Sequence, residues 1–120
     1  MPRSARSIKI KRVYEAPAKS DGTRILVDRL WPRGLSKDKA AVDVWLKDIA
    51  PSGTLRKWFG HDPERWSEFQ TRYRAELKKN DEAVLQLREL LRQGPVTLVY
   101  GARDEEHNDA VVLSRFLSAG

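Results

Sequence analysis

The sequence contains no cysteine, which excludes disulfide bonds, thiolate nucleophiles and cysteine-ligated metals. Long apolar runs are missing too: the longest hold only a few residues, far fewer than the ~20 that a membrane-spanning helix needs. Residues 1–12 are basic but include no apolar stretch of the kind found in secretory signal peptides. These absences predict a cytoplasmic protein without a membrane partner.

Several motifs of catalysis and cofactor binding are also absent. The sequence has no Walker-type phosphate loop, no glycine-rich dinucleotide fingerprint and no Gly-x-Ser-x-Gly elbow. Nucleotide hydrolysis by a P-loop, redox chemistry on a Rossmann fold and serine-hydrolase chemistry therefore lose support. Side chains that can ligate metals do occur, but without the short spacing that indicates a metal site; they are His61, Asp62, Asp104, Glu106 and His107. We therefore expect neither a metal nor a redox cofactor.

What is present fits one globular domain. The chain has 120 residues, 40% of them hydrophobic, and four tryptophans, which suffice for a single core. The formal net charge of +6 favours anionic partners such as phosphorylated metabolites, other acids or nucleic acid. Solubility alone explains the positive charge equally well, because 17 acidic residues are interleaved with the basic ones.

Three segments have the pattern of strands. Residues 8–13 alternate between apolar and basic side chains, which predicts a strand with one solvated face. Residues 24–31 contain a continuous apolar run, as in a central parallel strand covered on both faces. Residues 96–100 form a third short apolar strand, preceded by a Gly-Pro break.

Capping residues and apolar stripes predict the helices. Ser36 and Ser52 are placed to cap short helices through Lys39 and Phe59, and Asp62-Pro63 is a typical helix start. A helix with a regular apolar stripe follows, and Asn80-Asp81 separates it from a further helix that ends at Gly94. The closing residues, 110–117, also have a helical face.

Residues 41–50 are ambiguous. Val42, Val44 and Leu46 alternate as in a strand, whereas the spacing of Asp43 and Lys47 suits a helical ion pair. The pattern alone slightly favours a helix. The succession of strands and helices predicts an α/β domain over residues 8–117, with a small, mainly parallel sheet flanked by helices and a flexible basic tail at 1–7.

The first candidate site follows the strand at 24–31. Two guanidinium groups, Arg29 and Arg33, are expected beyond the carboxyl end of that strand, where they could grip a phosphate or carboxylate. Asp28 would orient an arginine or carry a proton. The structural alternative is an Asp–Arg pair that braces a turn, with Trp31 in the core.

A second candidate site follows the last strand. Arg103 and the helix start after it offer positive charge to an anion, and His107 could transfer protons near neutral pH. Asp104 and Asn108 would complete the site or simply cap the helix. Charged loops at helix starts are common, so a purely structural role is equally well supported.

A third cluster surrounds His61. Aromatic residues beside Lys57 and His61 could stack on a base or ring. The more usual role of such residues is in the core, with Asp62 as the helix cap. We expect His61 and Lys47 to lie near the other candidates rather than to form a separate site.

Four stretches of the sequence closely resemble the YeaO-like branch of the family called domain of unknown function 488: VDRLWPRGLSK (27–37), WLKDIAPS (45–52), LRKWFGHDPERW (55–66) and YGARDEEHNDAVVL (100–113). The resemblance covers roughly residues 8–117 and implies an α/β fold in which the segment 42–50 is a strand. The wider family often has cysteines after its last strand. This chain has none there, so thiol chemistry does not carry over.

These observations lead to a hypothesis of a small-molecule site. Arg29, Arg33 and Arg103 would hold a phosphorylated or carboxylated ligand, and Asp28 or His107 would move a proton if the site is catalytic. The remaining expected site residues are Trp31, Lys47, His61, Asp104 and Asn108. The alternatives are a non-catalytic nucleic-acid-binding protein, which would use the same basic surface, and an interaction module. Neither the reaction nor the oligomeric state follows from the sequence.

Overall fold

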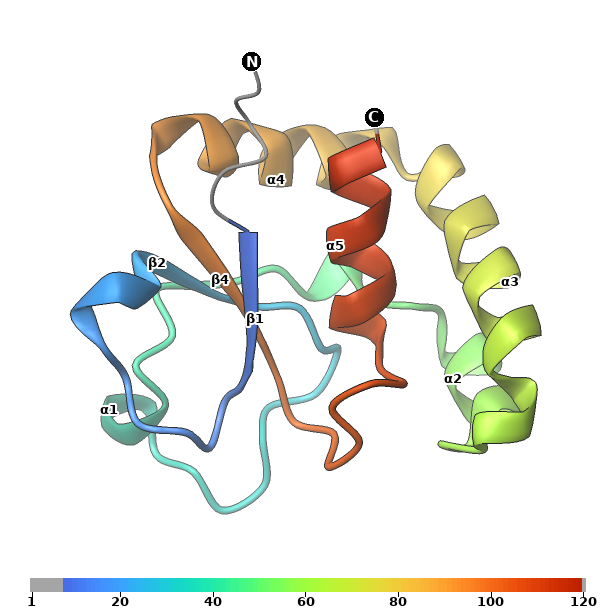
Figure 1. The fold of residues 1–120 in the computed structure, drawn as a ribbon, viewed down its shortest axis with the longest axis horizontal. Helices are drawn as coiled ribbons and strands as arrows, with labels where there is room; N and C mark the ends of the chain where they lie inside the picture. The colour runs from blue at the N-terminus through green and yellow to red at the C-terminus, as the bar shows by residue number, and fades with distance from the viewer. Residues whose placement is uncertain (1–7, 120) are drawn as a thin grey trace.

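A computed structural model describes residues 8–119 and contains a four-stranded parallel sheet. Its strands are β1 (Ile8–Arg12), β2 (Thr23–Leu26), β3 (Val44–Trp45) and β4 (Val96–Tyr100), arranged in the order β1-β4-β2-β3 (Figure 1). Every residue of β4 is buried, as expected for the strand paired on both sides. The expected α/β fold with a parallel sheet is confirmed. The expected tail at 1–7 lies outside the described residues.

Helices cover the sheet unequally on its two faces. Helices α2 (Gly53–Phe59), α3 (Trp66–Lys79), α4 (Asp81–Gln93) and α5 (Asp109–Ala119) all contribute to one large hydrophobic core. On the other face, α1 (Lys37–Ala40) and the segments beside it enclose a smaller cluster. None of the helices in residues 8–119 is long and apolar enough to cross a membrane.

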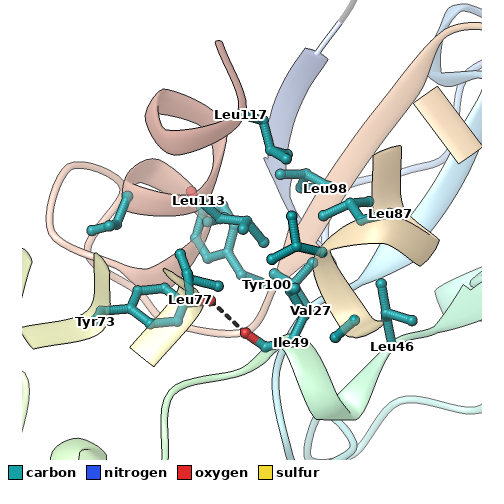
Figure 2. Close-up of a cluster of buried hydrophobic side chains, with 14 of the residues drawn as sticks. Val27, Leu46, Ile49, Tyr73, Leu77, Leu87, Leu98, Tyr100, Leu113 and Leu117 are labelled. Atoms are coloured by element: carbon teal, nitrogen blue, oxygen red, sulfur yellow. Dashed lines mark hydrogen bonds between the residues drawn. The ribbon is translucent and has the colours of Figure 1, made fainter. Parts of the chain in front are cut away.

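Strand β4 shows how the two faces are built. Val96, Leu98 and Tyr100 point into the large core, whereas Val99 belongs to the smaller cluster, as the two-residue period of a strand requires. Figure 2 shows the large core, where side chains of β4 meet those of α3, α4 and α5. The buried Tyr73 hydroxyl donates a hydrogen bond to the Ile49 carbonyl over 2.7 Å, so its polar group is satisfied.

The expected caps are confirmed at three helix starts. Ser36 Oγ accepts a hydrogen bond from the Lys39 N–H, and Ser52 Oγ accepts one from the Leu55 N–H. Asp62 caps the short 3-10 turn Pro63–Arg65 that leads into α3. Gly60 ends α2 in the left-handed conformation, with φ of 53°.

The helix favoured by the pattern of residues 41–50 is wrong, and the strand implied by the family resemblance is present as β3. Asp43 forms no helical pair with Lys47; its carboxylate instead accepts a hydrogen bond from the Arg24 N–H. The strand expected at 24–31 is shorter than the apolar run, because β2 ends at Leu26 and the chain bends through residues 28–30. A 3-10 turn, Lys47–Ile49, follows β3.

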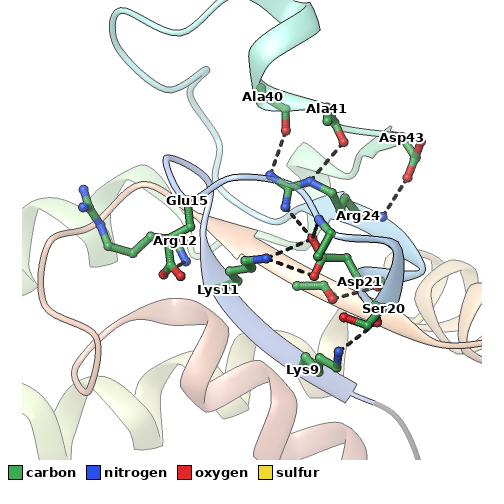
Figure 3. Close-up of polar contacts among 12 residues, drawn as sticks. Lys9, Lys11, Arg12, Glu15, Ser20, Asp21, Arg24, Ala40, Ala41 and Asp43 are labelled. Atoms are coloured by element: carbon green, nitrogen blue, oxygen red, sulfur yellow. Dashed lines mark hydrogen bonds and ion pairs between the residues drawn. The ribbon is translucent and has the colours of Figure 1, made fainter.

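A buried polar cluster braces the sheet on the face opposite the large core (Figure 3). The Asp21 carboxylate accepts hydrogen bonds from Lys11 Nζ, from Arg24 Nη1 at 2.8 Å and from the Ala18 N–H. Burial alone would raise the pKa of Asp21, but these donors lower it to about 2. The cluster therefore ties β1, β2 and the turn between them together.

Candidate functional site

A cavity of about 410 Å³ lies beyond the ends of strands β2 and β4. All four strands are parallel, so their carboxyl ends share one edge of the sheet, where ligands bind in open α/β folds. The segments that follow β2 and β4 run toward the lower edge of Figure 1. The cavity is lined by Tyr14, Asp28, Arg29, Leu30, Trp31, Pro32, Arg33, Pro51, Arg56, Phe59, His61, Phe69, Gly101, Ala102, Asn108 and Asp109.

Hydrogen bonds hold the two segments together at the base of the cavity. The Gly101 N–H donates to Asp28 Oδ2 over 2.8 Å, which joins the segment after β4 to the segment after β2. Arg12, the last residue of β1, donates from Nε to the Ala102 carbonyl over 2.9 Å. The site is thus fixed by three neighbouring strands rather than by one mobile loop.

Three arginines, Arg29, Arg33 and Arg56, line the cavity. The Nε atoms of Arg29 and Arg56 are buried, yet neither has a hydrogen-bond partner among the described residues. A buried donor without an acceptor costs about 1–3 kcal/mol, so such groups call for an explanation. Arg33 is exposed, and its backbone carbonyl accepts a hydrogen bond from the Tyr14 hydroxyl.

Two carboxyl groups, Asp28 and Asp109, also lie in the wall. Burial raises the pKa of Asp109 well above its usual range, and the nearby Asp28 charge raises it further. Burial likewise raises the pKa of Asp28, although the hydrogen bond with Asp109, the Gly101 N–H and the charges of Arg56 and His61 oppose this effect. The two groups interact directly, so they titrate as one pair that retains a proton more readily than isolated aspartates.

Aromatic side chains complete the wall. Phe59 and Phe69 stack with ring centroids 4.2 Å apart, and both rings line the cavity. Trp31 is held by a hydrogen bond from its Nε1 to the Leu35 carbonyl over 2.7 Å and by edge contact with Trp45. The site therefore combines cationic, acidic and apolar surfaces.

The structure brings six of the ten expected site residues to this cavity: Asp28, Arg29, Trp31, Arg33, His61 and Asn108. Asn108 is buried and serves as a cap, since its Oδ1 accepts a hydrogen bond from the Val111 N–H in α5. Its amide nitrogen donates to the Asp104 carbonyl. Asn108 thus shapes the wall through backbone contacts.

The other four expected residues do not line the cavity. Arg103 is exposed, and Lys47 lies over the Trp45 ring with its Nζ 4.4 Å from the ring centroid. His107 lies in a separate, more polar hollow, where its Nδ1 is 2.9 Å from Asp104 Oδ2 and its ring meets the edge of Trp66. The pKa of Asp104 is lowered by hydrogen bonds from the Glu106 N–H and from His107.

Sequence reasoning missed two polar residues of the cavity, Arg56 and Asp109. Arg56 lies inside the short helix predicted after Ser52, and Asp109 lies between the charged stretch 103–108 and the helical face expected at 110–117. One signal was available for Asp109, because it occupies the first turn of a helix that follows a parallel strand. Within residues 8–119, no group of three or more His, Cys, Asp or Glu side chains is placed to hold a metal ion.

Comparisons with known proteins agree on the family. The family model described as "Inactive DUF488-N3 subclade" matches residues 7–120. The uncharacterized protein Rv3073c of Mycobacterium tuberculosis H37Rv is 43% identical over 111 residues, which cover 92% of this chain and 93% of the relative. The uncharacterized protein YeaO of Escherichia coli K12 is 42% identical over 111 residues, which cover 92% of this chain and 96% of the relative.

No solved structure matches the chain closely enough for comparison. The family model nevertheless spans almost the whole chain, and both relatives are matched over nearly their full length. The chain therefore belongs to the DUF488 family and is similar over most of its length to YeaO.

Proposed function

We propose that this protein binds a small anionic molecule in the cavity beyond β2 and β4. The observation that carries the proposal is the convergence of three arginines, Arg29, Arg33 and Arg56, on the wall of one cavity. Oxygen atoms of a phosphate or carboxylate would accept hydrogen bonds from these guanidinium groups and balance their charges. Arg33, exposed at the rim, would add a third contact.

Binding without turnover is the form of the proposal that the comparisons favour. The matching family model is described as an inactive subclade. His107, one of the two residues expected to carry a proton, lines a different hollow from the arginines. Asp28 does line the cavity, and we assign it to ligand recognition.

A nucleic-acid-binding protein is the alternative, suggested by the net charge of +6. The shape of the site favours a small ligand, because the arginines share a concave wall with aromatic and proline side chains. The dependence of binding affinity on salt concentration distinguishes nucleic-acid binding from small-ligand binding. Binding to duplex DNA through phosphates weakens with a log–log slope of about −0.9 per contact, whereas a small ligand in a cavity should lose much less affinity.

Calorimetric titration with phenyl phosphate and with benzoate tests the proposal, because these probes attach the two candidate anions to the same ring. We expect saturable binding of at least one probe, and Arg56→Met should weaken it about tenfold or more. Arg33→Ala should also weaken it while leaving the melting temperature almost unchanged, since Arg33 is exposed. Arg92→Met, an exposed change on α4, is the matched control.

The result that contradicts the proposal is equally specific. Equal binding by wild type, Arg56→Met and Arg29→Met would place the anion elsewhere. Labelled duplex DNA or RNA that binds with a steep salt slope, together with no binding of either small probe, would favour the nucleic-acid alternative.

A further inference from the structure

Two aspartates from distant parts of the chain face the same cavity as the arginines. Asp28 follows β2, whereas Asp109 begins α5, and both line the wall. The backbone fixes Asp28, because one of its oxygens accepts the Gly101 N–H at 2.8 Å. Two neighbouring carboxyl groups are costly to bury, so their position beside the cavity indicates that they bind part of the ligand.

The charges around the cavity limit the kind of anion that fits. Three arginines line it, and burial raises the pKa of both carboxyls, so the pair retains a proton more readily than two isolated aspartates and carries less than two negative charges. The wall therefore holds an excess of more than one positive charge from these five side chains. A phosphate monoester carries about −1.5 to −2 charges at neutral pH and balances this excess, whereas a single carboxylate does not.

The carboxyl pair limits the rest of the ligand. A protonated carboxyl donates a hydrogen bond and an ionised one accepts, so the pair offers both functions to the cavity. A hydroxyl group is its natural complement, because it also donates and accepts. An alkyl group at the same place would remove water from the pair without replacing the lost hydrogen bonds.

We propose that Asp28 and Asp109 together recognise a hydroxyl group, so that the cavity selects a hydroxylated phosphate monoester. This inference rests on the proposed function, since the arginines must hold the phosphate for the hydroxyl to reach the pair. The stacked rings of Phe59 and Phe69 would cover an apolar face of the ligand between its two polar ends. The cavity volume of about 410 Å³ lies in the range usual for small-molecule sites.

The test compares two phosphate monoesters that have a six-membered ring, glucose 6-phosphate and cyclohexylmethyl phosphate. Only the first carries ring hydroxyls. Calorimetric titration of the wild-type protein at pH 7 should show about tenfold or more preference for glucose 6-phosphate. Asp109→Leu should reduce this preference to about one, while cyclohexylmethyl phosphate still binds through the arginines.

A control variant and a second substitution keep the test decisive. Asp48→Leu changes an exposed aspartate outside the cavity and should preserve the preference. If Asp109→Leu fails to fold, Asp109→Ala replaces it, because alanine adds no bulk to the wall. Circular dichroism and the melting temperature establish which variants are folded.

Failure of this inference and failure of the proposed function give different results. Equal affinity of the wild type for both esters, with arginine-dependent binding, would overturn hydroxyl recognition and leave the anion site intact. A preference that survives in the folded Asp109 variants would also overturn it. Absence of binding by both esters and by phenyl phosphate would reject the two proposals together.

Discussion

Two kinds of arginine contribute buried nitrogen atoms to this domain, and their hydrogen bonds distinguish them. Arg24 is only 3% exposed, and its guanidinium donates to Asp21 and to the carbonyls of Ala40 and Ala41. Arg29 and Arg56 each retain a buried Nε without an acceptor in the part of the chain described. The first pattern is that of a structural brace, whereas in the second the guanidinium group is not held by an internal hydrogen bond at Nε.

Replacing Asp21 tests the structural cluster. Asp21→Asn should lower the free energy of unfolding by about 3 kcal/mol at pH 7, because it leaves the buried Arg24 without its charge partner. The pKa of Asp21 is lowered from 3.8 to about 2 in the folded protein, so its contribution is complete above pH 3.8 and lost as pH falls through about 2. Urea unfolding at several pH values should therefore show the wild type and the variant converging in acid.

A control separates this effect from general loss of charge. Asp48→Asn removes an exposed carboxylate and should change the free energy of unfolding by less than about 0.5 kcal/mol. A constant difference between wild type and Asp21→Asn from pH 7 to pH 2 would contradict the assignment of the lowered pKa to this cluster.

At the residue scale, sequence reasoning identifies side chains that stand next to strand ends. Arg29 and Arg33 were expected at the end of β2, and both line the cavity. Arg103 also follows a strand, but it is exposed and does not line the cavity, because a loop residue can point either way. Arg56 enters from α2, and its approach depends on helix packing that no local pattern encodes.

At the element scale, capping chemistry and apolar spacing account for most boundaries. Helix α3 illustrates this, since its stripe buries Phe69, Tyr73 and Leu77 in the large core. The segment around β3 is the exception. Its two-residue strand is specified by pairing with β2 and by the Asp43 contact with the Arg24 backbone, both of which are tertiary interactions.

The packing of α3 against α2 gives a prediction at this scale. Phe69→Ala should lower the free energy of unfolding by about 3–5 kcal/mol, because Phe69 is 2% exposed and stacks on Phe59. Trp66→Ala should cost less, since Trp66 is only partly buried. Leu85→Ala on α4, where the side chain is 65% exposed, is the control and should cost little. Denaturant unfolding of the three variants gives the ranking, and equal losses would refute the packing argument.

At the scale of the whole molecule, parallel strands and the segments after them determine where the cavity lies. The α/β pattern in the sequence was sufficient to predict that edge of the sheet, because carboxyl ends of parallel strands gather ligands. It was not sufficient to predict the pairing of Asp28 with Asp109. That pairing requires α5 to start beside the end of β2, which follows from the strand order β1-β4-β2-β3.

This pairing should be visible in the stability of the intact protein. The raised pKa of Asp109 means that the folded state binds a proton more tightly than the unfolded state, so wild-type stability falls as pH rises above 3.8 toward the raised value. Asp109→Asn removes this loss. Its free energy of unfolding should equal that of the wild type near pH 4 and exceed it increasingly at higher pH, by at most about 1.4 kcal/mol for each pH unit.

Asp109→Asn should thus become more stable than the wild type as pH rises. Asp21→Asn should instead be less stable than the wild type, with the largest loss of unfolding free energy at neutral pH, so the two variants test opposite pH dependences. Urea unfolding of wild type, Asp109→Asn and the exposed control Asp48→Asn between pH 4 and pH 9 measures how the free energy of unfolding depends on pH. If the free energy of unfolding of Asp109→Asn changed with pH in parallel with that of the wild type, the carboxyls would not share a proton. The charge balance that favours a phosphate monoester would then fail, because two ionised carboxylates leave an excess of only one positive charge against three arginines.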